Sequence, residues 1–215
     1  MSTEKGILLI DKPKGITSFD VVKEVKKQTG EKKVGHAGTL DPLATGLMVI
    51  GVGEGTKKLT EYIGANKTYT AEVCIGERST TGDAEGEITE KSTVENIAKD
   101  KVEDILTGMK GILRLEVSIY SAMKKGGEEF YKKARRGERV TPPQRDMEVI
   151  QTKLESEIRY KNDCAYCDIE FEVGSGTYIR SLAEELGRRL GYPARLENLR
   201  RTQVGEMNIT DADTI

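Results

Sequence analysis

The segment GHAGTLDPLATG, residues 35–46, places the single histidine of the chain, His36, five residues before Asp41, which is followed at once by proline. Pro42 lacks an N–H, fixes its own φ and biases Asp41 towards an extended conformation. The glycines of the segment allow backbone or a ligand to approach closely. Because the segment has neither a helical nor a strand period, we expect a loop. One interpretation is that this loop holds the carboxylate of Asp41 rigidly at the floor of a cleft.

A simpler interpretation fits the same residues. Asp41 would then form an Asx-type turn, in which its carboxylate accepts hydrogen bonds from nearby backbone N–H groups. Asp-Pro is a common turn dipeptide, and the spacing of the residues does not by itself choose between a turn and a catalytic carboxylate.

Two other segments suggest chemistry that their spacing does not support. GVGEGTKK, residues 51–58, lacks the spacing of a phosphate-binding loop and is expected to be a glycine-rich turn. Cys164 and Cys167 have the spacing of a metal knuckle but no second pair, and on a strand their sulfurs would face opposite sides. We therefore expect no nucleotide cofactor and no metal.

Composition favours a cytoplasmic protein. The chain has 215 residues, a formal net charge of −2 and three cysteines, too few for a disulfide framework. The apolar run near the first residue is too short for a signal peptide or a membrane span. Basic residues are concentrated in residues 120–145, which allows a positive face that neutralises phosphates. Solvated helix faces would give the same pattern.

The strands and helices that must position these residues are interspersed along the chain and do not alternate strictly. We expect strands over residues 6–11, 47–53, 68–76 and 167–173. Helices are expected over residues 17–30, 92–111 and 178–191, the first capped by Thr17 and the second by a capping box of Ser92 and Glu95. Without a repeat or a linker, this pattern predicts a single α+β domain over residues 1–215 with a mixed or largely antiparallel sheet.

Six blocks, in order along the chain, resemble the TruB family of tRNA pseudouridine synthases. GHAGTLDPLATG matches the family pattern G-H-x-G-x-L-D-P-x-A-x-G, and GILLIDKPKG resembles its lysine–proline motif at Lys12 and Pro13. The others are KTYTAEVCIGERSTTGDAEGEI, which includes Thr81, Asp83 and Gly86, then YSAMKKGGEEFYKKARRG, GSGTYIRSLAEELGRRLG and ENLRRTQVG. The chain departs from the family's usual pattern in having no proline-rich lead-in before Tyr120. Many members continue into a C-terminal PUA-type domain, which we do not expect here.

The resemblance implies the pseudouridine synthase catalytic fold, a bent mixed sheet flanked by helices and loops, with the cleft across its middle. It also implies conversion of uridine-55 to pseudouridine in the T arm of tRNA, by a monomer. The uracil N1–C1′ bond is broken, the base turns, and a bond to C5 replaces it. Nothing is oxidised and no group enters or leaves, so the reaction requires neither cofactor nor metal.

The resemblance assigns catalytic roles to Asp41, Arg180 and Tyr69. Asp41 is the essential carboxylate, Arg180 pairs with it, and Tyr69 packs on the base and assists the late proton transfer. Whether Asp41 attacks the sugar, attacks the base or removes a sugar proton stays open. Substrate contacts are expected from Tyr69 and from six further residues: Lys12, His36, Tyr178, Leu199, Lys132 and Arg136.

Those contacts divide by kind. Tyr178 and Leu199 line the uracil pocket, and His36 contacts the nucleotide that must leave its stack. Lys132 and Arg136 fall at helical spacing and would lie along the phosphates.

Two other functions remain for comparison. A glycoside hydrolase with Asp41 as nucleophile would need a second carboxylate about 5–9 Å away, and no motif block marks one. A non-catalytic RNA-binding module would use the basic segments but gives no joint role to Asp41, Arg180 and Tyr69.

Overall fold

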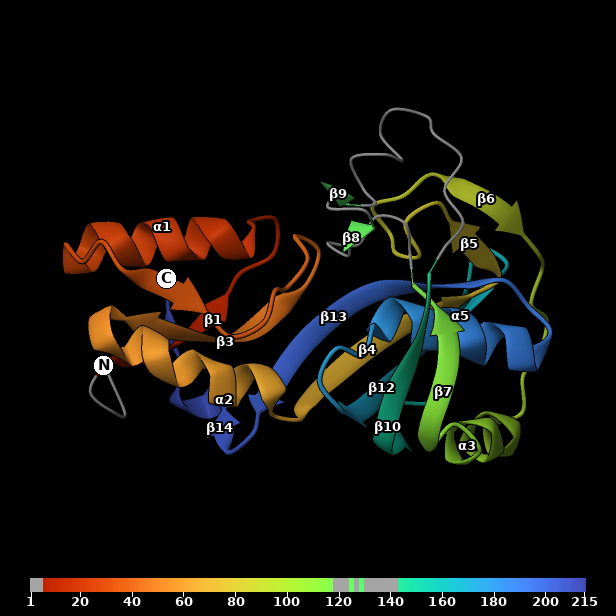
Figure 1. Ribbon diagram of the computed structural model, residues 1–215. Coiled ribbons are helices and arrows are strands. Elements are labelled where there is room, and N and C mark those ends of the chain that lie inside the picture. Colours follow the sequence, from red (N-terminus) through yellow and green to blue (C-terminus); the bar gives the residue numbers. More distant parts are fainter. Residues whose placement is uncertain (1–5, 118–123, 126–127, 130–142) are drawn as a thin grey trace. The chain divides into compact units, whose positions relative to one another are not determined.

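The computed structural model describes residues 6–117, 124–125, 128–129 and 143–215. These residues form two compact units (Figure 1). Unit 1 contains the residues up to Ala71 together with Glu170–Ser175 and Asn198–Ile215, and unit 2 contains Glu72–Ile169 and Gly176–Glu197. Three long strands contribute residues to both units: β4 (Lys67–Ile75), β12 (Cys164–Val173) and β13 (Ala194–Val204).

In unit 1 the strand order is β15-β1-β3-β13. β1 (Ile7–Lys12) runs antiparallel to β3 (Thr45–Val52), from Ile7 opposite Gly51 to Lys12 opposite Gly46. β15 (Asp213–Thr214) is parallel to β1, and β13 is parallel to β3 at Arg200 and Arg201. Two short strands pair at the side, β2 (Val34–His36) with β3 and β14 (Met207–Asn208) with β13.

The helices of unit 1 are α1 (Ser18–Thr29) and α2 (Leu59–Gly64), with short 3-10 turns at Gly53–Lys58 and Ile209–Asp211. Thr17 caps α1 through a capping box with Asp20, and Gly30 ends it in the left-handed conformation, so the predicted helix is confirmed. One cluster of the core combines residues of β1, β3, α2 and β13 with Ala37, which follows β2: Ile7, Leu9, Ala37, Leu47, Val49, Leu59, Tyr62 and Val204.

In unit 2 the order is β13-β4-β12-β10-β7. β10 (Gln144–Leu154) runs antiparallel to β7 (Gly111–Glu116), and β11 (Arg159–Lys161) runs antiparallel to β12. Separate two-stranded sheets are formed by β5 (Glu77–Ser79) with β6 (Ile88–Lys91) and by β8 (Lys124–Lys125) with β9 (Glu128–Glu129). Helix α3 (Lys99–Thr107) packs on β10 and on α5 (Ile179–Leu190).

The sheet and the amphipathic stripes agree with the sequence prediction. The sheet contains both parallel and antiparallel pairs, so the predicted α+β fold with a mixed sheet is confirmed. The predicted apolar stripe of α5 is buried, as are the predicted inward faces of β4 and β12: Ile179, Leu182, Ala183, Leu186, Leu190, Tyr69, Ala71, Val73, Ile75, Ile169, Phe171 and Val173.

The prediction of a helix over residues 92–111 was wrong at its start. Helix α3 begins at Lys99, and its N-cap, Ala98, has no side chain that can cap. The backbone N–H groups of Ser92 and Val94 instead donate to the carbonyls of Gly76 and Asp163, each over 2.8 Å. Tertiary hydrogen bonds therefore hold the segment in an extended path, and the local capping-box pattern does not form a helix.

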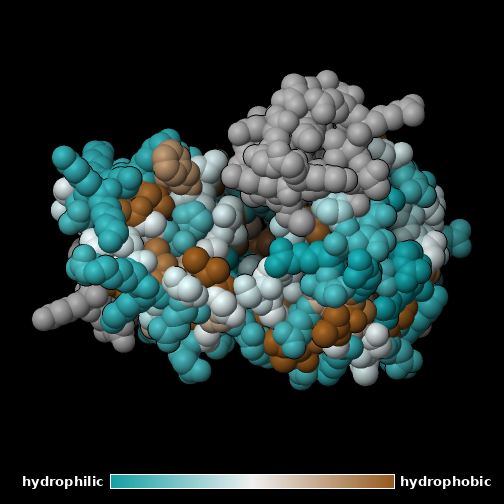
Figure 2. All heavy atoms as spheres, in the orientation of Figure 1, coloured by the Kyte–Doolittle hydropathy of each residue, from teal (hydrophilic) through white to brown (hydrophobic). Residues whose placement is uncertain are grey.

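Hydrophilic residues dominate the face of the molecule shown in Figure 2, and hydrophobic residues appear there in small groups. Within the described residues, no helix is both long and apolar enough to cross a membrane.

Candidate active site

Asp41 lies in the loop between β2 and β3, in unit 1, and is half-buried. The Ala44 N–H donates to the Asp41 carbonyl over 3.0 Å, which closes a turn. Gly46 ends the loop with φ +106°, and a Cβ at this position would lie 2.2 Å from the carbonyl oxygen of Arg201. Only glycine allows β3 and β13 to meet here, so the position at which the loop joins β3 is fixed.

Lys12 fixes the loop directly after Asp41. Its side chain is fully buried, and its Nζ donates to the carbonyls of Pro13, Ile16 and Pro42 over 3.0, 2.7 and 3.4 Å. The Gly15 N–H donates to the same Pro42 carbonyl over 2.8 Å. The lysine–proline motif of the sequence therefore ties the segment after β1 to the aspartate loop.

Ser18 fixes the loop directly before Asp41, and sequence reasoning assigned it no role. Its buried Oγ donates to the Leu40 carbonyl over 2.9 Å and accepts from the Leu40 N–H over 2.8 Å. Because Ser18 is the first residue of α1, a rigid helix end holds the residue before Asp41.

Arg201 lies beneath the loop and is 1% exposed. Its Nε donates to the Leu47 carbonyl over 2.7 Å and its Nη2 to the Gly38 carbonyl over 3.1 Å. Lys67, also buried, donates to the carbonyls of three residues that precede it in the chain: Tyr62, Ile63 and Ala65. Burial, and secondly the charge of Arg201, lower the pKa of Lys67 to about 8.

His36 ends β2 and is half-buried. Burial, and then the charge of Arg201, lower the pKa of His36, while a hydrogen bond with the Gly38 backbone acts in the opposite direction. Its buried Nδ1 has no hydrogen-bond partner among the described residues. A neutral imidazole with an unused polar atom is suited to contact a polar ligand.

Tyr69 and Leu199 also belong to unit 1. Tyr69 is 7% exposed on the inward face of β4, and Leu199 is half-buried on β13. The Leu199 carbonyl accepts from the Thr45 hydroxyl over 3.4 Å. Unit 1 thus carries five of the predicted site residues: Lys12, His36, Asp41, Tyr69 and Leu199.

Unit 2 carries Tyr178 and Arg180, at the start of α5. Arg180 is 8% exposed; its Nη1 donates to the Thr81 carbonyl over 2.9 Å and lies 3.8 Å from an Asp83 carboxylate oxygen. The Asp83 carboxylate also accepts from the Thr81 hydroxyl and from the Glu85 N–H.

The T-x-D-x-x-G pattern of Thr81, Asp83 and Gly86 therefore forms a support for Arg180. A Cβ on Gly86 would lie 2.4 Å from the Thr81 Oγ1, so a glycine is needed for the turn to close. The sequence marked these three residues only as part of a motif. Their role depends on a contact between residues about 100 positions apart, which spacing along the chain does not reveal.

The predicted phosphate contacts Lys132 and Arg136 lie outside the described residues. Other basic residues of the sequence are paired with acids: Arg188 and Arg189 with Glu185, each over 2.7 Å, and Arg200 with Asp11 over 2.6 Å.

The fold matches that of chains in two solved structures. A chain in "Crystal Structure of a Cbf5-Nop10-Gar1 Complex" superposes with a TM-score of 0.71 and 24% identity, covering 98% of this chain and 52% of that one. A chain in "Structure of H/ACA RNP bound to a substrate RNA containing 2'-deoxyuridine" superposes with a TM-score of 0.70 and 23% identity. The match covers 97% of this chain and 50% of that one. This chain spans about half of each, and at these identities the likeness establishes the fold.

The family follows from the sequence comparisons. The model described as "TruB family pseudouridylate synthase (N terminal domain)" matches residues 26–179. The "tRNA pseudouridine synthase B" of Paenarthrobacter aurescens is 42% identical over 98% of this chain and 68% of its own length. The "tRNA pseudouridine synthase B" of Corynebacterium diphtheriae is 39% identical over 99% of this chain and 71% of its own length. The chain belongs to the TruB family of pseudouridylate synthases.

Proposed function

We propose that this chain converts uridine to pseudouridine at position 55 in the T arm of tRNA, with Asp41 as the essential carboxylate. The observation that carries the proposal is the way the Asp41 loop is held within a member of this family. Relatives with about 40% identity bear the name tRNA pseudouridine synthase B, which supports tRNA as the substrate.

The geometry of the loop suits a catalytic carboxylate. Lys12, Ser18 and Arg201 bind backbone groups of the loop and of its two ends through the hydrogen bonds described above. A carboxylate on a fixed backbone can act at C1′ or on the base without a large cost of reorganisation. The Asx-turn interpretation accounts for a turn at Asp41 but gives no reason for buried cations to hold its surroundings.

The other residues keep the roles that the family resemblance assigns. Arg180 is the catalytic arginine that pairs with Asp41, Tyr69 packs on the base and assists the late proton transfer, and Tyr178 and Leu199 line the uracil pocket. His36 contacts the nucleotide that is swung out of its stack, which costs a few kcal/mol. The unused Nδ1 of His36 supports a contact with RNA better than the role of a general base.

Phosphate contacts in this proposal come from Lys132 and Arg136. The reaction is an isomerisation that proceeds without a cofactor, because no electrons are transferred and no group is gained or lost.

The direct test uses unmodified tRNA transcribed in vitro. After incubation with the protein, carbodiimide labelling and primer extension locate pseudouridine along the transcript. We expect a single stop at position 55, and none from a transcript with cytidine at that position. Modification confined to other uridines would contradict the assigned position, and the absence of pseudouridine with intact protein would contradict the proposed activity.

A further inference from the structure

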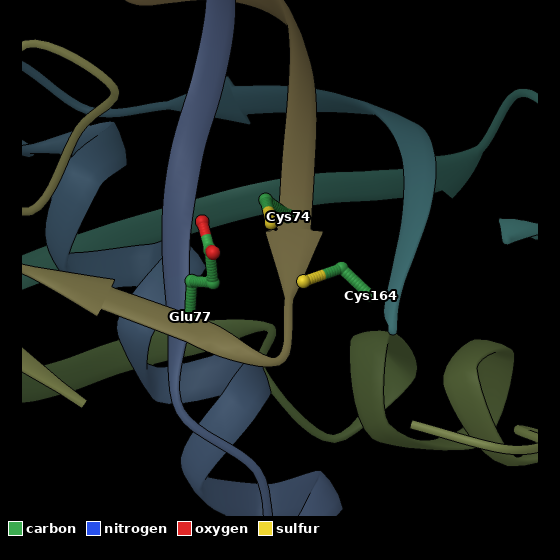
Figure 3. Close-up of side chains that lie close together, drawn as sticks. All are labelled: Cys74, Glu77 and Cys164. Carbon is green, nitrogen blue, oxygen red and sulfur yellow. The ribbon is translucent and has the colours of Figure 1, made fainter. Parts of the chain in front are cut away.

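Three side chains with metal-binding chemistry meet within unit 2 (Figure 3). Cys74 comes from the end of β4, Glu77 from the start of β5 and Cys164 from the start of β12. Their ligand atoms all lie within 4.8 Å of one another. Both thiols are buried, with 0% and 4% exposure, while the carboxylate is half-buried.

Two sulfurs and one carboxylate oxygen form a donor set that zinc prefers in proteins. In a tetrahedral zinc site with Zn–S bonds of about 2.3 Å, neighbouring ligand atoms are roughly 3.5–3.8 Å apart. A contraction of up to about 1.3 Å would bring these three atoms to that spacing. We propose that Cys74, Glu77 and Cys164 form a binding site for a thiophilic divalent metal ion, with Zn²⁺ as the expected occupant and a fourth coordination position left to solvent.

The backbone between the ligands supports the proposal. Gly76, with φ +117°, turns the chain between Cys74 and Glu77. A Cβ on Gly76 would lie 3.1 Å from the Cys164 sulfur and 2.9 Å from the Ser92 carbonyl oxygen. The glycine thus allows the turn to close tightly around a sulfur of another strand, which places Glu77 beside both thiols.

The surrounding charges complement a metal with three anionic ligands. Such a centre would carry a net charge of −1, and two cations already bind Glu77: Lys91 over 2.7 Å and Arg195 over 3.0 Å. Hydrogen bonds of this kind orient a ligating carboxylate.

Arg195 also provides a specific reason for a thiolate at this position. Its buried Nε has no hydrogen-bond partner among the described residues, and its charge acts on the Cys74 thiol. Arg195 already pairs with the carboxylates of Glu77 and Glu197, and deprotonation of Cys74 by a metal would place a thiolate near its remaining, unpartnered Nε.

Metal binding must release protons. Cysteine binds a metal ion as the thiolate, and an ordinary thiol is largely protonated at neutral pH. Binding of M²⁺ breaks two S–H bonds, forms two M–S bonds and releases two protons to solvent. The affinity should therefore rise about 100-fold for each unit of pH.

Cys167 provides a matched control. It is fully buried on the same strand as Cys164, but it lies three residues further along and therefore on the opposite face of β12. The sequence suggested the pair Cys164 and Cys167, whereas the structure brings Cys164 to Cys74, 90 positions away in the chain.

The test is a titration of the reduced, tag-free protein with Co²⁺ and then Zn²⁺. We expect one equivalent of Co²⁺ to give a thiolate-to-cobalt charge-transfer band that Zn²⁺ abolishes, with two protons released. Cys74→Ala and Cys164→Ala should lose the band, Glu77→Gln should bind at least about 10-fold more weakly, and Cys167→Ala should behave as wild type. Zn²⁺ should raise the Tm of the wild type and of Cys167→Ala, raise that of Glu77→Gln by less, and leave that of Cys74→Ala and Cys164→Ala unchanged.

The absence of a thiolate band from the reduced wild type would overturn the proposal, as would a band that survives in Cys164→Ala. Glu77→Gln leaves the apolar core intact, so it tests the site even if a cysteine variant fails to fold. Unchanged affinity in Glu77→Gln would contradict the three-ligand site. The readouts are spectroscopic and thermal, and they are independent of activity on tRNA.

Discussion

The two units hold their predicted catalytic side chains in opposite ways. In unit 1 the backbone around Asp41 is anchored, by Lys12, Ser18 and Arg201. In unit 2 the anchors bind the head group of Arg180 itself, through Thr81 and Asp83. A substitution of the Asp41 side chain therefore leaves these backbone anchors in place, whereas a substitution of Arg180 removes hydrogen bonds of its own unit.

The largest effect that distinguishes the two arrangements is expected from Arg180→Ala. Turnover should fall about 10²–10³-fold, because a preorganised charge is lost. Stability should fall by about 1–3 kcal/mol, because Asp83 is left buried without its cation. Single-turnover rates and urea unfolding would measure both. Arg188→Ala on the exposed face of α5 is the control, and an Arg180→Ala enzyme with normal turnover would remove the arginine from the mechanism.

Ser18→Ala breaks the backbone anchor of unit 1. The Leu40 N–H and carbonyl both lose their buried partner, which should cost roughly 2 kcal/mol. We expect a lower Tm and a decrease in turnover of about 10-fold, since the Asp41 carboxylate would be held less firmly. Thr39→Ala, an exposed substitution in the same loop, should leave both quantities unchanged. A normal Tm in Ser18→Ala would show that this anchor is dispensable.

A smaller effect is expected from Lys132→Ala combined with Arg136→Ala. Loss of two phosphate contacts should flatten the salt dependence of tRNA binding by about 1.8 units in the log–log slope. Turnover at saturating tRNA should change little. Lys23→Ala with Lys27→Ala on α1, where both lysines pair with acids, provides the comparison. An unchanged slope would place the phosphate contacts elsewhere, though not at Arg201, which is buried.

The smallest expected effect is the pH dependence contributed by His36. Its lowered pKa means that the folded state disfavours protonation. The stabilisation from neutral His36 is complete above about pH 6.5 and is lost as the pH falls through the folded-state pKa. Between about pH 7.5 and about pH 5, wild type should lose more stability than His36→Asn. Parallel Tm curves for the two proteins would contradict this.

The sequence predicted the features that depend on local pattern. Helix α1 was found from Thr17 and Gly30, and β4, β12 and α5 were found from the periodicity of their apolar residues. The prediction of a helix from the capping box at Ser92 was wrong, because the Ser92 N–H donates to the carbonyl of Gly76. No local pattern in the sequence encodes that tertiary hydrogen bond.

The candidate site divides in the same way. Asp41 stood out through its own neighbours, but the anchors of its loop did not. Ser18 lies 22 positions before Leu40, to which it binds, and Arg201 lies 163 positions after Gly38. The pairing of Cys74 with Cys164 likewise depends on the order of strands in the sheet.

The central claim is tested most directly by single-turnover pseudouridine formation with Asp41→Asn. This change removes the negative charge and little volume, and the anchors at Leu40 and Pro42 bind only backbone. We predict no detectable pseudouridine at position 55, with tRNA affinity within a few-fold of wild type and an unchanged Tm. Measurable formation of pseudouridine by pure Asp41→Asn protein would contradict the account.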